Sequence, residues 1–255
     1  MRLTHDAVVA TDVVLSYGGH IAVERSSFTI PRPGITAIIG PNGSGKSTIL
    51  NAVAGLLTPL SGTINTTGEG GGCRISYVLQ TTRVNDNLPL SVDEVVTMGR
   101  YPTTGWFSRM DADDRARVES AMDRTGASDF RLRHLHELSG GQRQRAFLAQ
   151  GLAQDHDILL LDEPMAGIDQ PTAQAIDDVI HDEADEGCAV VVTTHDLTEA
   201  QVADHVILVN GRVIASGPPE EVITPEHLDA AYGSAVLHPD HGVPMIDDPA
   251  HPQVD

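Results

Sequence analysis

A glycine-rich loop between a short strand and a helix is the feature that most constrains the fold of this chain. Residues 35–39 are apolar, and the segment that follows reads Gly-Pro-Asn-Gly-Ser-Gly-Lys-Ser-Thr. Residues 46–54 then favour a helix that Gly55 ends. Strand, loop and helix in this order are typical of a phosphate-binding loop, in which backbone N–H groups and the helix N-terminus face phosphate oxygens. Its candidate nucleotide-binding residues are Gly40, Pro41, Asn42, Gly43, Ser44, Gly45, Lys46, Ser47 and Thr48.

The rest of the chain alternates between strand-like and helical segments. Strands are predicted at residues 8–17, 21–30, 75–79, 158–161, 189–193 and 206–209, with hairpin turns at Gly18-Gly19 and Asn210-Gly211. Helical periodicity marks residues 92–100, 112–125 and 140–153, and a helix of about fifteen residues begins at Pro171. The helical block lies between β-rich halves, as an insertion would. The pattern predicts a parallel α/β sheet with ligands at the carboxyl ends of its strands.

Polar side chains at strand ends supply the candidate chemistry. Asp162 and Glu163 close the apolar run of residues 158–161, where a buried carboxylate is costly without a role. We expect Asp162 to hold Mg²⁺ together with the Ser47 hydroxyl, and Glu163 to act as the general base toward the attacking water. Gln80 ends another strand and can reach the same Mg²⁺ and water, and His195 follows the next strand and can lie near the γ-phosphate.

Composition excludes several classes of protein. The formal net charge of −20 over 255 residues opposes a role in binding duplex nucleic acid, which needs a basic face. No apolar run approaches the ~20 residues that a spanning helix requires. The N-terminus lacks the basic start of a signal peptide. Cys73 and Cys188 are expected to be reduced thiols, so the chain is predicted to be cytosolic.

Leu138, Ser139, Gly140, Gly141 and Gln142 lie between the two halves of this candidate site. With the phosphate loop, the apolar run before Asp162 and Glu163, and the other motifs in order, they give the chain a close resemblance to the ATP-binding-cassette (ABC) ATPases over roughly residues 8–237. The resemblance implies a RecA-like parallel sheet with an antiparallel β subdomain and an inserted α-helical subdomain. It also implies ATP hydrolysis with Mg²⁺, a D-loop at Asp169, and adenine stacking on Tyr17, for which ordinary packing is about as good an explanation.

The same resemblance predicts partners. The pentapeptide from Leu138 to Gln142 is the family signature, which acts in trans on the γ-phosphate held by a second copy in a head-to-tail homodimer. Integral-membrane permease subunits are expected to hold the chain peripherally at the cytoplasmic face of the cell membrane. Trp106 and Phe107 in the helical block are candidates for the docking surface, with a place in the core about as plausible.

Several segments resemble the ATPases of manganese and zinc importers, among them Met98-Gly99-Arg100-Tyr101 and Ala231-Tyr232-Gly233. This predicts an ATP-hydrolysing subunit that powers import of a divalent metal ion, delivered by an extracytoplasmic metal-binding protein to the permease. The ATPases of siderophore, haem or cobalamin importers remain an alternative. Soluble ABC ATPases that act on ribosomes or DNA are a weaker alternative, because the negative charge of this chain opposes binding to nucleic acid.

The expected domain boundaries follow these motifs. Residues 1–81 form the first part of the ATP-binding core, 82–152 the helical subdomain, 153–237 the second part of the core, and 238–255 a flexible tail. The tail carries nitrogen and oxygen ligands suited to Zn²⁺ or Mn²⁺, for which an unstructured end is the stronger explanation. These are His238, Asp240, His241, Asp247, Asp248 and His251.

Overall fold

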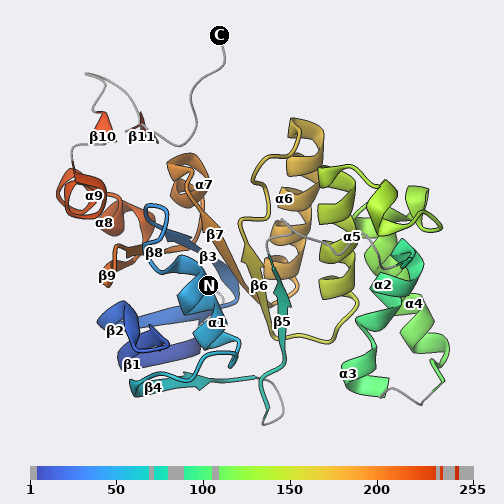
Figure 1. Ribbon diagram of the computed structural model, residues 1–255, viewed down its shortest axis with the longest axis horizontal. Coiled ribbons are helices and arrows are strands. Elements are labelled where there is room, and N and C mark those ends of the chain that lie inside the picture. The colour runs from blue at the N-terminus through green and yellow to red at the C-terminus, as the bar shows by residue number, and fades with distance from the viewer. Residues whose placement is uncertain are drawn as a thin grey trace. The chain divides into compact units, whose positions relative to one another are not determined.

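A computed structural model describes residues 5–68, 72–79, 89–104, 109–233, 236–237 and 245–246 (Figure 1). The chain forms two compact units that both draw on distant parts of the sequence. The first contains Arg32–Gly34 and Thr67–Val192, together with the residues up to Ala7. The second contains Val8–Pro31, Ile35–Thr66 and the chain from Thr193. No helix among the described residues is both long and apolar enough to span a membrane.

An antiparallel sheet in the second unit confirms the predicted hairpin and adds a strand. The sheet has the order β2 (His20–Arg32), β1 (His5–Tyr17) and β4 (Ser61–Thr66). β4 pairs with β1 from Val8↔Thr66 to Val14↔Ser61, with a register shift between Thr11 and Val14. Before the shift the alternating buried residues of β1 include Val8 and Ala10, and after it they are Val13 and Leu15. The irregularity thus changes which positions alternate, and the strand keeps the same face buried on both sides of it.

Parallel strands carry the candidate site in both units. In the second unit β3 (Gly34–Ile39) pairs with β8 (His205–Val209) in parallel, and β9 (Val213–Gly217) closes antiparallel on β8 after the predicted turn. In the first unit β5 (Ile75–Val78) pairs in parallel with β6 (Ile158–Asp162). Every residue of β3 and of β6 is buried, as expected of strands covered on both faces.

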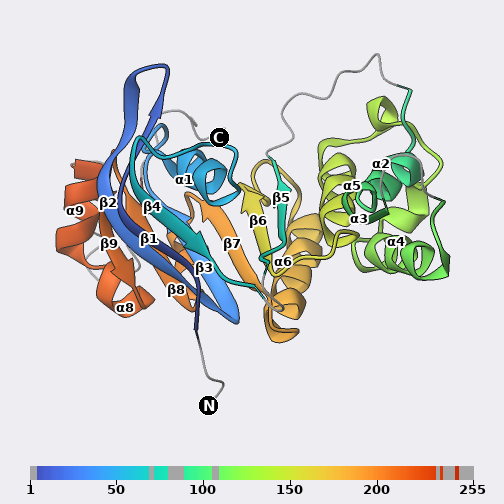
Figure 2. The same cartoon turned by 90° about the horizontal axis from the view of Figure 1, so that it is seen from below.

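The remaining strands and helices alternate with these. β7 (Ala189–Thr194) follows α6 (Gln170–Asp185), and α1 (Lys46–Val53) follows the glycine-rich loop. Three more helices confirm the predicted block, which lies together in both views (Figures 1 and 2): α2 (Val92–Met98), α4 (Ala112–Arg124) and α5 (Gly140–Leu152). The shorter elements, which the sequence did not predict, are α3 (Tyr101–Thr104), α7 (Leu197–Gln201), α8 (Pro219–Val222), α9 (Pro225–Tyr232), β10 (Val236–Leu237) and β11 (Met245–Ile246).

The helical block has a hydrophobic core of its own. Val96, Met122 and Ala149 from its three helices are fully buried there, and Leu138 of the signature packs in the same core. A buried ion cluster closes the block: the Arg100 guanidinium donates to Asp114 at 2.9 Å and to the carbonyl of Ala153 at 2.8 Å.

Candidate functional site

The phosphate loop in the second unit is built around glycines that no other residue could replace. A Cβ on Gly40, whose φ is 152°, would stand 2.0 Å from the carbonyl oxygen of Val209 in β8. A Cβ on Gly45, whose φ is 110°, would stand 2.6 Å from a methyl group of Val23 in β2. Distances below 3.0 Å leave no room for a side chain, so the loop backbone packs directly on the strands beneath it. The sequence identified the glycines, but the neighbours that require them come from the fold.

Two polar side chains of this loop lie in its interior. The Lys46 ammonium donates to the carbonyl oxygens of Gly40 at 2.8 Å and of Pro41 at 3.2 Å. The hydroxyl of Ser44 is buried with no hydrogen-bond partner among the described residues. A buried hydroxyl without a partner is uncommon in folded proteins, and it fits a loop whose polar groups complete their bonds on a ligand. Lys46 begins α1, so the amide groups of the helix N-terminus face the same space.

Tyr17, the candidate for adenine stacking, ends β1 and contacts α1, the helix that follows this loop. Its surface is 48% exposed, and its hydroxyl accepts a hydrogen bond from the Asn51 amide of α1 at 3.1 Å. An exposed ring anchored through its hydroxyl offers a flat face at low entropic cost. The contribution of Asn51 was not anticipated, because nothing in its local sequence marks it as a partner of a residue 34 positions earlier.

The paired carboxylates lie in the first unit, at the carboxyl end of β6. Asp162 is the last residue of the strand and is only 8% exposed. Glu163 follows with φ at 48°, a left-handed conformation that costs a residue with a side chain about 1–2 kcal/mol. Its carbonyl oxygen accepts from the amide of Ala166 at 3.2 Å. The tight turn thus holds Glu163 in strained backbone immediately after a rigid strand, which is typical of functional residues.

The predicted signature caps α5. Ser139 is exposed at the helix N-cap, and its hydroxyl accepts from the amide of Gln142 at 3.3 Å. The Gln142 side chain accepts in return from the amide of Ser139 at 3.1 Å, which completes a capping box. The arrangement turns a helix N-terminus and Gly140 toward solvent, a suitable surface for an anion.

Within the same unit the signature meets the predicted D-loop. A Cβ on Gly141 would lie 3.3 Å from Thr172 and 3.5 Å from Asp169, so a side chain there would crowd Thr172. Asp169 caps α6 by accepting from the amide of Thr172 at 3.0 Å. This backbone hydrogen bond lowers the pKa of Asp169 and keeps the carboxylate ionised. Thr172 is a neighbour that sequence reasoning missed.

For the other predicted residues the structure gives little or no detail of their contacts. His195 belongs to the second unit, where it is exposed and directly follows the last residue of β7. Gln80, Trp106 and Phe107 lie outside the described residues, as do the six histidines and aspartates of the tail, so their predicted roles stay predictions. Arg100 belongs to a segment that resembles the ATPases of manganese and zinc importers. It is buried and ion-paired, because its charge is needed to neutralise carboxylates inside the helical block.

Comparison with known proteins identifies this architecture. A family model described as "ABC transporter" matches residues 23–166, more than half of the chain. The chain belongs to the ABC transporter family. As an ABC ATPase it binds ATP and acts as the ATP-hydrolysing subunit of a transporter.

Individual ABC ATPases are similar along most of their length. The zinc transport system ATP-binding protein TroB of Treponema pallidum is 40% identical over 234 residues, which cover 90% of this chain and 88% of TroB. The manganese transport system ATP-binding protein MntA of Synechocystis is 37% identical, covering 89% of this chain and 86% of MntA. Among solved structures, an inward-facing ABC transporter described as metal-chelate type matches with a TM-score of 0.78 and 26% identity, covering 89% of this chain and 88% of that one. These matches confirm the expected ABC ATPase fold.

Proposed function

We propose that this ABC ATPase powers the import of a divalent metal ion, manganese or zinc, through a separate membrane permease. The observation that carries the proposal is the similarity to transport subunits named for zinc and for manganese over 90% and 89% of the chain. In this proposal the chain is held at the cytoplasmic face of the cell membrane, and an extracytoplasmic metal-binding protein delivers the cargo to the permease.

A second candidate cargo is a metal chelate. The solved transporter of metal-chelate type is similar along 89% of this chain. The ATPase subunit never needs to touch the cargo, so its own catalytic residues do not separate a free cation from a chelate. The distinction rests on the permease.

The residues that we assign to the ATP site are suited to binding its phosphates. The crowded backbone at Gly40 and the buried hydroxyl of Ser44 both indicate a loop shaped to accept phosphate oxygens. Lys46 supplies a point charge to the β- and γ-phosphates, and Ser47, Asp162 and Gln80 would hold Mg²⁺, which neutralises charge that develops on the phosphates. Glu163 would orient and deprotonate the attacking water, with His195 near the γ-phosphate.

The signature is proposed to act on the second copy of a homodimer. Ser139 and Gly140 are exposed at the N-terminus of α5, where the partial positive charge of a helix favours a phosphate. The proposed functional parts keep the predicted boundaries: residues 1–81 and 153–237 for ATP binding and 82–152 for the signature and permease docking.

Uptake measurements test the cargo. Cells that lack the chain are complemented with it or with Glu163→Gln, and accumulation of radioactive manganese, zinc and a ferric chelate is compared. We expect the wild-type chain alone to restore manganese or zinc uptake. Restoration of chelate uptake only would support the second candidate and reject the first.

A mixture of two inactive variants tests action in trans. Ser139→Arg places a bulky cation where the partner's γ-phosphate would lie, and Lys46→Ala removes the phosphate-binding ammonium. Each homodimer lacks both composite sites, whereas the heterodimer keeps one. ATPase activity should therefore reappear on mixing, and its failure to do so would contradict the head-to-tail dimer.

A further inference from the structure

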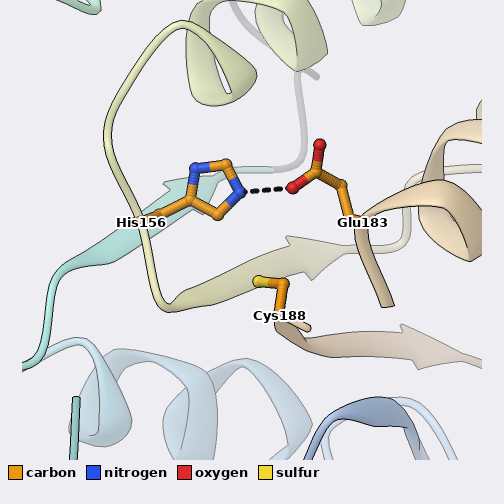
Figure 3. A group of neighbouring side chains, drawn as sticks. All are labelled: His156, Glu183 and Cys188. Atoms are coloured by element: carbon orange, nitrogen blue, oxygen red, sulfur yellow. Dashed lines mark hydrogen bonds and ion pairs between the residues drawn. The ribbon is translucent and has the colours of Figure 1, made fainter. Parts of the chain in front are cut away.

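Three side chains in the first unit form a cluster that the ATPase reaction does not use. His156 lies in the loop before β6, Glu183 on the last turns of α6, and Cys188 just before β7 (Figure 3). One ligand atom from each, a ring nitrogen, a carboxylate oxygen and the Cys188 sulfur, lie within 4.8 Å of one another. Figure 3 shows the imidazole facing the carboxylate, with the sulfur beneath them.

The remaining polar atoms of the cluster already have the partners that metal ligands need. Nδ1 of His156 lies 2.9 Å from the carbonyl oxygen of Gln154, which fixes the ring so that Nε2 faces the cluster. One oxygen of Glu183 accepts from Arg124 at 2.6 Å, and the other lies 2.8 Å from Nε2 of His156. Ligating histidines in proteins usually donate their second nitrogen to a carbonyl, and ligating carboxylates are usually hydrogen-bonded in turn.

Backbone contacts bring the three ligands together without flexible linkers. The amide of Cys188 donates to the carbonyl oxygen of Glu183 at 3.0 Å, which closes the end of α6. The amide of Ala189 donates to the carbonyl oxygen of Asp157 at 3.1 Å, which joins the start of β7 to the residue after His156. The ligands are therefore held on a rigid frame.

The cluster opens into a pocket, so an ion and a water molecule can reach it. The pocket has a volume of about 500 Å³, and His156, Glu183 and Cys188 are all part of its wall. Four arginines and four carboxylates share this wall, so it carries no excess of positive charge against a cation. Two of these arginines are paired with carboxylates: Arg32 with Asp157, and Arg124 with Glu183 itself.

We propose that His156, Glu183 and Cys188 form a binding site for a zinc-like divalent cation, completed by water from the pocket. Nitrogen, oxygen and sulfur together suit Zn²⁺ and do not suit Mg²⁺, which takes oxygen ligands. The site is distinct from the nucleotide site, because β6 begins two residues after His156 and spans about 13 Å before it ends at Asp162. Bound metal would tie the loop before β6 to the end of α6.

The same groups share protons when they hold no metal, and the cation must displace them. Burial disfavours the charged imidazole, but hydrogen bonds to Cys188 and Glu183 outweigh it and raise the pKa of His156 to about 10. Binding therefore releases the proton of Nε2 to solvent. A titration in mildly alkaline buffer with a non-thiol reductant limits this competition.

Two cysteines give the test a matched control. The full-length chain, freed of metal, is titrated with Zn²⁺ against a chromophoric chelator, and Cys188→Ser and His156→Gln are compared with Cys73→Ser. Cys73 lies in the same unit but outside the cluster. We expect Cys188→Ser and His156→Gln to weaken the tightest site by at least about 100-fold, beyond the usual effect of an outer-shell change. Cys73→Ser should match the wild-type chain.

Co²⁺ gives a second, spectroscopic readout of the same site. Cobalt bound by a thiolate absorbs in the near ultraviolet through charge transfer, so the wild-type chain should develop this band and Cys188→Ser should not. Absence of the band from the wild-type chain, or equal Zn²⁺ affinity in all the variants, would overturn the proposal and leave a hydrogen-bonded network. This inference is independent of the proposed cargo, because neither measurement involves transport or ATPase activity.

Discussion

Strained backbone at Glu163 predicts that the residue most needed for turnover is also one that weakens the fold. With φ at 48°, it occupies a conformation that costs an L-residue about 1–2 kcal/mol and glycine almost nothing. Glu163→Gly should release this strain, and Glu163→Ala should retain it while removing the same carboxylate. The difference in stability between the two variants therefore measures the free-energy cost of the backbone conformation at residue 163.

Glycine also gains entropy in the unfolded chain, which offsets about 0.5–1 kcal/mol of the released strain. We therefore expect Glu163→Gly to be more stable than Glu163→Ala by about 0.5–1 kcal/mol. For a chain of this size the difference corresponds to about 1–4 °C in the melting temperature. Glu163→Gln should keep the strain and the shape of the wild-type residue.

Calorimetry without nucleotide measures the melting temperatures, and release of phosphate measures turnover. All three variants should lose ATPase activity by about 10²–10⁴-fold, the usual contribution of a general base. Nucleotide binding should persist in each. If Glu163→Ala were as stable as Glu163→Gly, the strain argument would be wrong, and near-normal turnover in Glu163→Gln would remove Glu163 from the role of base.

Three further outcomes follow from single contacts. Tyr17→Ala should weaken ATP binding about tenfold and Tyr17→Phe should not, since a stacked base contributes about 1–3 kcal/mol through the ring; a fluorescent nucleotide measures both. Gly40→Ala should cost about 1–3 kcal/mol of stability and abolish nucleotide binding, because its Cβ would overlap the carbonyl of Val209. Burial opposes ionisation of Asp114, but hydrogen bonds led by Arg100 prevail and hold its pKa below the ordinary 3.8. That carboxylate therefore stabilises the fold above this pH and loses its effect as acid protonates it, so Asp114→Asn should flatten the acid side of the stability profile in urea titrations.

Local chemistry decides what could be predicted from the sequence. A capping box such as that of Ser139 and Gln142 joins residues three apart, and β6 is apolar from Ile158 to Leu161, so neither depends on distant neighbours. The order of the phosphate loop, the signature and the paired carboxylates can likewise be read without knowing the structure of the segments between them. For this reason the ABC ATPase family and its main elements follow from the sequence.

Tertiary structure decides the contacts between segments that are far apart along the chain. β4 is mostly exposed, with no clear apolar alternation, and forms because the edge of β1 offers it hydrogen bonds. The burial of Arg100 depends on Asp114 being brought to it by another helix. The cluster of His156, Glu183 and Cys188 joins residues that each look ordinary in the sequence. Such pairings have no local signal, because their free energy comes from burial and geometry that exist only after the strands and helices have packed.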